Sequence, residues 1–330
     1  MNREETNRLM LRYLSEDSRS TITKLSSVLN CSRPTVMKIL EYLERNADLR
    51  YTLELDLSKK IPLERHLITV KFAVKPNAYD ISELIKKDGY IHNAYATEGD
   101  FDLVLHAISR DPLEYIRWEN RIVTELSQYK PVFKPSELIM THFGFLPFNN
   151  GVKDILKGII KEKDNMLIEE LNKNSRTSYA ELSKLTGIDE ETIRYRLFKL
   201  RETGIIKRFT TCVQKPRYPY NIMFFANYRF NKETAKHAEM ARNSYIKAKA
   251  ENELGSNYQL LAPLSGSYRF FAMANFESKE DAMKNAIRRH KFIFESENVE
   301  IKHARIISVM KGMMPYRNLD IQRNYTRIDW

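Results

Sequence analysis

The chain has 330 residues, of which 42% are hydrophobic and 29% are charged, and its formal net charge is +11. These ordinary globular values argue against a disordered or fibrous protein, and the length allows several small domains, each with its own core. The positive charge favours a polyanionic partner.

Cysteine usage and hydropathy narrow the class of protein further. Cys31 and Cys212 are far apart and lack CxxC spacing, which argues against a disulfide scaffold or a zinc site and fits a reducing compartment. No apolar run approaches the roughly 20 residues that span a bilayer, and the charged N-terminus is unlike a signal peptide. We therefore expect a cytoplasmic protein with no membrane partner and no metal.

Residues 1–60 are predicted to form a helix-turn-helix. The first helix has an apolar stripe, residues 20–26 open a second helix, and Ser32 with Pro34 begins a third. The apolar stripes of the first and third helices are Leu9, Met10, Tyr13, Leu14 and Val36, Ile39, Leu40, Leu43. The alternating segment 51–57 is predicted to be a strand, serving as a wing or as a linker.

Residues 61–150 change to an alternation of strands and helices. The expected elements are a strand at 67–74, a helix at 78–87, strands at 90–97 and 101–109, a helix from 111 to 126, and a strand within 132–145. The order β-α-β-β-α-β is that of a ferredoxin-like domain, with helices on one face of an antiparallel sheet.

Residues 151–215 are predicted to form a winged helix-turn-helix. Ser178 is an expected N-cap with Glu181 three residues later, Gly187 suits the turn, and Asp189 is expected to cap the third helix. Ile193, Leu197 and Leu200 form the buried stripe of that helix, and residues 205–213 form the wing. Its outward side carries polar and basic side chains, as a helix in the major groove requires.

The two helix-turn-helix segments are copies of each other. Arg19 and Arg176, Leu25 and Leu182, and Val36 and Ile193 are all separated by 157 residues, which indicates an internal duplication. The first copy lacks the Gly-Ile-Ile that opens the second wing, and its outward basic set is sparser. Whether the first copy contacts DNA is left open.

Residues 176–210, RTSYAELSKLTGIDEETIRYRLFKLRETGIIKRFT, resemble the DNA-binding domain of the leucine-responsive (Lrp/AsnC) regulators of bacteria and archaea. The resemblance implies a transcription regulator that binds double-stranded DNA and forms homo-oligomers, here with a dimer of the fused chain left open. The candidate DNA-contacting residues are Thr192, Arg194, Tyr195, Arg196, Lys199, Lys207, Arg208, Arg33, Thr35 and Lys38.

In that family the β-α-β-β-α-β unit is the RAM domain, and residues 99–102 resemble its Gly-Asp-x-Asp signature. The resemblance implies that Gly99, Asp100 and Asp102 receive the amino group of an amino-acid-like effector, although ordinary hairpin chemistry explains these residues equally well. The second copy, residues 216–312, has expected strands at 220–230, 258–265, 268–276 and 299–311 and helices at 232–254 and 279–295. Its turn, residues 266–269, lies 167 residues after the first turn and lacks both acids.

The basic and aromatic tail, residues 313–330, is open to three interpretations: nucleic-acid contact, packing on the sheet, or disorder. The predicted fold class is α+β, two winged helix-turn-helix domains alternating with two ferredoxin-like, RAM-like domains. The RAM-like domains are expected to pack together within one chain as a covalent pseudo-dimer on an asymmetric operator.

The sequence contains few motifs that are typical of enzymes. The seven histidines lack metal-ligand spacing, and neither a P-loop nor GxGxxG is present, so we expect a non-enzyme without a cofactor. Two alternatives remain. Siroheme decarboxylases resemble Lrp/AsnC proteins in fold and combine two such units, and His92-Asn93-Ala94-Tyr95 partly matches the segment of their tetrapyrrole site. An interaction scaffold that does not bind DNA is the other.

Overall fold

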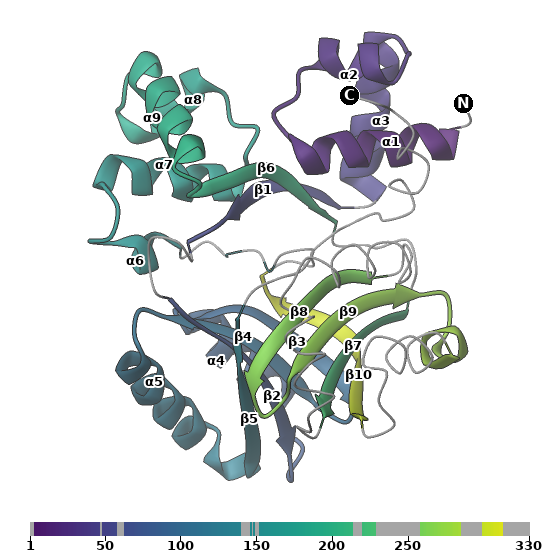
Figure 1. The fold of residues 1–330 in the computed structure, drawn as a ribbon, viewed down its shortest axis with the longest axis vertical. Helices are drawn as coiled ribbons and strands as arrows, with labels where there is room; N and C mark the ends of the chain where they lie inside the picture. Colours follow the sequence, from purple (N-terminus) through teal and green to yellow (C-terminus); the bar gives the residue numbers. More distant parts are fainter. Residues whose placement is uncertain are drawn as a thin grey trace.

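The computed structural model describes residues 3–46, 48–57, 63–139, 146, 148, 152–213, 220–228, 258–284 and 299–312. The chain has the predicted α+β fold, with two helical units above a β-barrel (Figure 1). The expected helix at 232–254, most of the helix at 279–295 and the tail at 313–330 lie outside the described residues. Within the described residues, no helix combines the length and apolar character that crossing a membrane requires.

Both helix-turn-helix units form as predicted. The first contains α1 (Arg3–Glu16), α2 (Ile22–Val28), α3 (Arg33–Asn46) and β1 (Leu49–Leu55). The second contains α6 (Val152–Leu156), α7 (Glu162–Lys173), α8 (Tyr179–Thr186), α9 (Glu190–Glu202) and β6 (Ile206–Val213). Their apolar stripes converge on two separate cores, one around Leu14, Leu25 and Val36 and the other around Leu171, Leu182 and Ile193.

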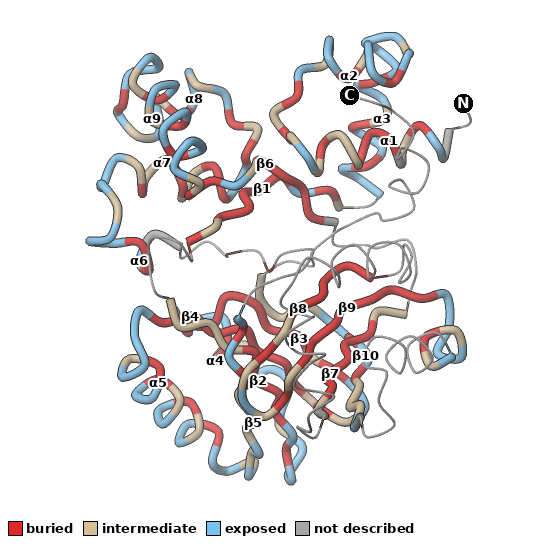
Figure 2. The backbone as a smooth tube through the Cα atoms, viewed as in Figure 1, coloured by how far each residue is buried: buried red, intermediate tan, exposed pale blue. Residues whose placement is uncertain are grey.

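The two wings form one shared ribbon, which we define as β1 paired antiparallel with β6. Leu49 lies opposite Val213 and Leu53 opposite Phe209. The prediction that exposed and buried residues alternate along β1 is wrong, because every residue of the strand except Arg50 is buried. The ribbon lies between the helical units and the barrel, so both of its faces are covered (Figures 1 and 2).

The eight remaining strands close into one barrel in the order β10-β3-β4-β2-β5-β8-β9-β7. The first half supplies β2 (Glu64–Phe72), β3 (Ile91–Gly99), β4 (Leu103–Ser109) and β5 (Pro131–Leu138), with α4 (Ala78–Lys87), α5 (Pro112–Glu125) and a 3-10 turn at Ser127–Tyr129. The second half supplies β7 (Tyr220–Tyr228), β8 (Tyr258–Gly266), β9 (Phe270–Phe276) and β10 (Val299–Lys311). Each half keeps the ferredoxin-like strand order, and β3–β10 and β5–β8 pairs join the halves.

Aromatic side chains fill the interior of the barrel. Phe101, Phe225 and Tyr268 meet at ring-centroid distances of 5.2 to 5.9 Å, so residues from both halves share one core. Phe224, Phe225, Phe270 and Phe271 of the second half are all buried as well. Tyr228 belongs to β7, but its burial lies outside what the structure describes.

The two halves of the barrel differ by an insertion. β3 and β8 begin 167 residues apart, whereas β2 and β7 begin 156 residues apart. The inserted residues therefore lie between β7 and β8.

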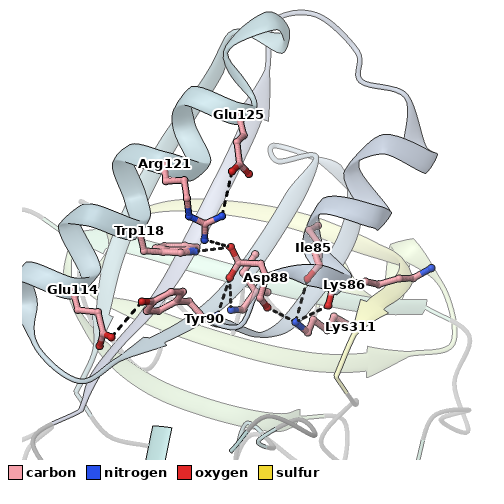
Figure 3. A network of polar contacts seen from close by, with 10 residues as sticks. Ile85, Lys86, Asp88, Tyr90, Glu114, Trp118, Arg121, Glu125 and Lys311 are labelled. Atoms are coloured by element: carbon pink, nitrogen blue, oxygen red, sulfur yellow. Dashed lines mark hydrogen bonds and ion pairs between the residues drawn. The ribbon is translucent and has the colours of Figure 1, made fainter. Parts of the chain in front are cut away.

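Asp88 connects β3 and α5 through its buried carboxylate and the end of β10 through its backbone oxygen (Figure 3). Asp88 follows α4 and accepts hydrogen bonds from Trp118 Nε1 at 3.0 Å and Arg121 Nη2 at 2.6 Å. Lys311 of β10 donates to the backbone oxygens of Ile85, Lys86 and Asp88, where α4 ends. A cation at the C-terminal end of a helix is favourably placed against the helix dipole.

Gly99 and Gly266 allow the halves to approach closely, and we expect Gly99→Ala to destabilise the chain. The φ angle of Gly99 is +131°, and a Cβ there would lie 2.8 Å from the backbone oxygen of His303 in β10. Backbone strain of this kind costs about 1–3 kcal/mol, and the clash adds to it. Urea denaturation should show a loss of at least about 2 kcal/mol. Gly89→Ala is the matched control, because no atom lies within 4 Å of its added Cβ; equal losses would contradict the prediction.

Candidate nucleic-acid interface

The second helix-turn-helix is fixed by local capping bonds that the sequence predicts. Ser178 Oγ accepts a hydrogen bond from the backbone N–H of Glu181 at 3.1 Å, and Asp189 Oδ1 accepts one from Thr192 at 2.8 Å. Gly187 supplies the turn between α8 and α9 with φ +69°. These bonds set the direction of α9, whose Ile193 and Leu197 are buried.

The outward side of α9 combines aromatic and charged side chains. With 3.6 residues per turn, the side opposite the buried stripe carries Glu191, Tyr195, Phe198 and Glu202. All four are exposed, Tyr195 by 62% and Phe198 by 56%. This is the surface that a DNA duplex would meet.

Arg194 and Lys199 lie on either side of that surface. The Arg194 guanidinium lies 4.3 Å from the centre of the Tyr179 ring, and its Nη2 is 3.7 Å from Glu190. Lys199 Nζ is 2.9 Å from Glu202. Because exposed ion pairs of this kind are weak, both cations can exchange these contacts for a phosphate or a base edge.

Arg196, also predicted to contact DNA, points elsewhere in the structure. Its Nη1 donates to Asp164 Oδ1 of α7 at 2.9 Å, and both side chains are less than one-quarter exposed. This bond attaches α9 to α7. Arg196 therefore has a structural contact that explains its presence without DNA.

Lys207 and Arg208 are committed to the ribbon. Both donate to the carboxylate of Glu54 in β1, which is only 5% exposed. Two cations on one buried carboxylate offset its desolvation. Lys207 and Arg208 therefore join the two wings through Glu54, whereas the sequence analysis predicted that they contact DNA.

Arg33, Thr35 and Lys38, which are candidate DNA contacts of the first unit, are all exposed on α3. The Ser32 hydroxyl accepts a hydrogen bond from the Thr35 backbone N–H at 3.3 Å and lies 2.8 Å from the Thr35 hydroxyl. Among the described residues, neither Arg33 nor Lys38 forms an ion pair. The first unit thus also presents cations to the solvent.

Residues at equivalent positions of the duplication touch each other and couple the two units. The hydroxyls of Ser18 and Ser175, separated by 157 residues, are 2.6 Å apart. Arg19 Nη1 donates to the backbone oxygen of Ser175 at 2.7 Å, and Arg176 Nη1 donates to the backbone oxygen of Ser18 at 2.8 Å. Arg19 also lies 4.8 Å from the Tyr179 ring that Arg194 contacts. Sequence reasoning did not assign these residues a function, although their constant spacing marked them.

The predicted ligand turn lies where the two halves meet. Asp100 Oδ2 accepts a hydrogen bond from the His303 backbone at 2.7 Å, whereas Asp102 accepts bonds from Lys71 Nζ at 2.8 Å and the Phe72 backbone at 2.9 Å. Gly99 provides the close approach to β10. These contacts support an interface role, and the effector role stays a prediction.

The segment from His92 to Tyr95 is buried at the barrel wall. The Asn93 side-chain nitrogen lies 3.0 Å from His106 Nδ1, and Arg65 Nε has no hydrogen-bond partner among the described residues. Burial, with smaller contributions from Lys311 and Arg65, lowers the pKa of His92 to about 3. Burial also lowers the pKa of Arg65 to about 10, against an opposing effect of Asp56. The imidazole of His92 is therefore neutral near pH 7.

Comparisons with known proteins agree with the helix-turn-helix geometry. Residues 160–207 match the winged helix-turn-helix DNA-binding family. The transcriptional regulator FL11 of Pyrococcus furiosus is 41% identical over 70 residues, which are 21% of this chain and 46% of FL11. The regulator LrpA of Pyrococcus horikoshii is 34% identical over 65 residues, 20% of this chain and 46% of LrpA. The chain thus contains a winged helix-turn-helix of the DNA-binding kind and resembles Lrp-type regulators over about a fifth of its length.

Along its whole length, the arrangement of the chain resembles a solved structure of another protein. The siroheme decarboxylase NirDL superposes with a TM-score of 0.59 at 13% identity, covering 96% of each chain. At this identity the similarity shows the fold alone. The chain spans about half the length of the curated relatives that it matches.

The predicted site residues fall into two groups in the structure. Side chains on the solvent-facing sides of α3 and α9 are Arg33, Thr35, Lys38, Arg194, Tyr195 and Lys199. Arg196, Lys207 and Arg208 contact protein carboxylates, and Thr192 is half-buried, with its backbone N–H bonded to Asp189. The first group defines the candidate interface.

Proposed function

We propose that the chain is a DNA-binding transcription regulator whose two helix-turn-helix units act together as a covalent pseudo-dimer. The observation that carries the proposal is the pair of exposed cations, Arg194 and Lys199, on the outward side of α9. Such cations neutralise phosphates, and arginine also binds guanine edges in the major groove. They lie within residues 160–207, which match the winged helix-turn-helix DNA-binding family. The chain is also similar to the regulators FL11 and LrpA, over 70 and 65 residues.

Three strand pairings support the pseudo-dimer. β1 pairs with β6 between the helical units, whereas β3 pairs with β10 and β5 with β8 between the halves of the barrel. Covalent linkage makes this association independent of protein concentration. Because α3 and α9 differ in sequence, we propose an operator with two unlike half-sites, roughly 34 Å apart as for successive major grooves.

The test is an affinity measurement with the full-length chain. A preferred duplex is first selected from a random-sequence library, and its affinity is then measured for the wild type and for Arg194→Ala/Lys199→Ala. A good base contact contributes about 1–3 kcal/mol, so the double variant should bind at least about tenfold more weakly. The wild type should also lose affinity linearly in log salt, which reports phosphate contacts.

Lys86→Ala/Lys87→Ala is the matched control, because it removes the same charge from the exposed end of α4. Equal losses in both double variants would indicate general electrostatics and contradict a specific role for α9. Arg196→Ala should act differently. It should lower the free energy of unfolding, because Asp164 is left without its ion pair.

Control by an amino-acid-like effector at Gly99, Asp100 and Asp102 is part of the proposal. The ammonium group of a ligand would have to replace Lys71 on Asp102, where the present distance is 2.8 Å. Calorimetric titration with free amino acids tests this step. Association of two fused chains, which light scattering measures, is proposed as well.

Tetrapyrrole decarboxylation is the second candidate function, favoured by the superposition of NirDL over both halves of the chain. His92 and His106 are neutral, buried imidazoles close to the Arg65 cation. Visible absorption during titration with siroheme separates the candidates. A bound chromophore followed by release of carbon dioxide would favour the enzyme over the regulator.

A further inference from the structure

Two large aromatic side chains on α9 are more than half exposed to solvent. Tyr195 is 62% exposed and Phe198 is 56% exposed. Lys199 Nζ lies 6.0 Å and 5.5 Å from the centres of their rings and is the cation nearest to both. Exposed aromatic side chains on an otherwise charged helix commonly mark a binding surface.

Their position in α9 determines what they would meet. Tyr195 and Phe198 are three residues apart and therefore adjacent on one side of the helix. That side is opposite the buried Ile193 and Leu197, so a duplex that receives α9 in its major groove would contact these rings first.

The chemistry of phenylalanine limits which base feature it can recognise. Its ring has no hydrogen-bond donor or acceptor, whereas guanine, cytosine and adenine are distinguished in the major groove by such groups. Thymine alone presents a methyl group there, and apolar side chains contact it. We infer that Phe198, assisted by Tyr195, recognises thymine methyl groups in the half-site bound by α9. This inference rests on the proposed DNA binding.

The charges around the rings are compatible with this contact. Glu202 would repel phosphates, but it lies 2.9 Å from Lys199 Nζ, and an ammonium group with three donors can contact this carboxylate and a phosphate at the same time. Arg194 lies on the other side of the rings. The pair of cations can therefore position the helix on the two phosphate strands while the rings face the base edges.

The first unit provides an internal comparison. At the duplication spacing of 157 residues, Lys38 is equivalent to Tyr195 and Glu41 is equivalent to Phe198. Lys38 and Glu41 are both exposed. Lysine binds guanine O6 and N7, whereas glutamate accepts from the cytosine amino group. Dependence on thymine methyl groups should therefore be confined to one half-site.

The experiment uses the full-length chain and the duplex selected from the random library. Thymines are replaced by deoxyuridine, which removes only the methyl group, first in one half-site and then in the other. Burial of one methyl-sized group corresponds to about fourfold in affinity. Substitution in the half-site bound by α9 should therefore weaken binding about fourfold for each contacted methyl group. Substitution in the other half-site should weaken binding by less than about twofold.

Variants assign the effect to the side chain. Phe198→Ala should bind thymine and deoxyuridine duplexes with equal affinity, whereas Phe198→Leu, which keeps an apolar contact, should retain most of the difference. Leu113→Ala is the matched control, since Leu113 is an exposed leucine of α5 on the barrel. It should behave as the wild type does.

The outcomes distinguish the inference from the function on which it rests. No selection of duplex DNA by the wild type would overturn the proposed function. Binding that is insensitive to deoxyuridine in both half-sites, or sensitivity that persists in Phe198→Ala, would overturn the thymine inference and leave DNA binding standing.

Discussion

Replacing Asp88 by alanine is expected to lower the free energy of unfolding by about 3–5 kcal/mol. Asp88 is only 4% exposed, and its carboxylate accepts hydrogen bonds from the Trp118 indole and from the backbone N–H groups of Tyr90 and Ile91. Each buried donor left without an acceptor costs about 1–3 kcal/mol. The lost ion pair with Arg121 contributes less to the destabilisation, because the Arg121 side chain is 45% exposed and can be rehydrated.

Urea denaturation followed by Trp118 fluorescence measures this loss, since the indole is bonded to Asp88 itself. Glu83→Ala is the matched control, because Glu83 is a partly exposed carboxylate on α4 that lies 3.6 Å from Lys86 and Lys87. Its loss should stay within about 0.5 kcal/mol. Similar losses in the two variants would show that the Asp88 hydrogen bonds contribute little.

Local structure could be predicted from the sequence because its causes are local. Ser178, Asp189 and Gly187 act within four residues of their own positions, and the helix boundaries that they imply match α8 and α9. The order of the strands in each ferredoxin-like half, and that of α4 and α5 in the first half, followed from alternation and turn chemistry. The duplication also indicated that the two RAM-like halves would lie together.

Contacts between distant segments could not be predicted in the same way. The pairing of β1 with β6, and the barrel closed through β3 and β10, depend on strands that are far apart in the chain. A cation in the sequence does not reveal which carboxylate lies beside it. For this reason Arg196 was expected at DNA, whereas it contacts Asp164.

Stability is expected to fall steeply as the pH is lowered from 7 to 5. Burial lowers the pKa of His66 to about 4 and that of His92 to about 3, and it holds the pKa of His106 well below its usual value. Unfolded histidines take up protons near pH 6.5. Between pH 6.5 and about 4 the unfolded chain therefore binds more protons than the folded chain, and stability is lost as the pH falls.

His92, whose side chain is fully buried, should account for a loss on the order of 1–2 kcal/mol by pH 5, since one pKa unit corresponds to about 1.4 kcal/mol. Urea denaturation at pH 7 and pH 5 measures the difference. The two halves of the barrel offer a reciprocal pair of variants. Gln259 in β8 lies 167 residues after His92, at the equivalent position, and is also buried. His92→Gln should reduce the difference between the two pH values, and Gln259→His should increase it. If His92→Gln leaves the difference unchanged, the acid sensitivity does not come from this buried imidazole, and carboxylates elsewhere in the chain must account for it.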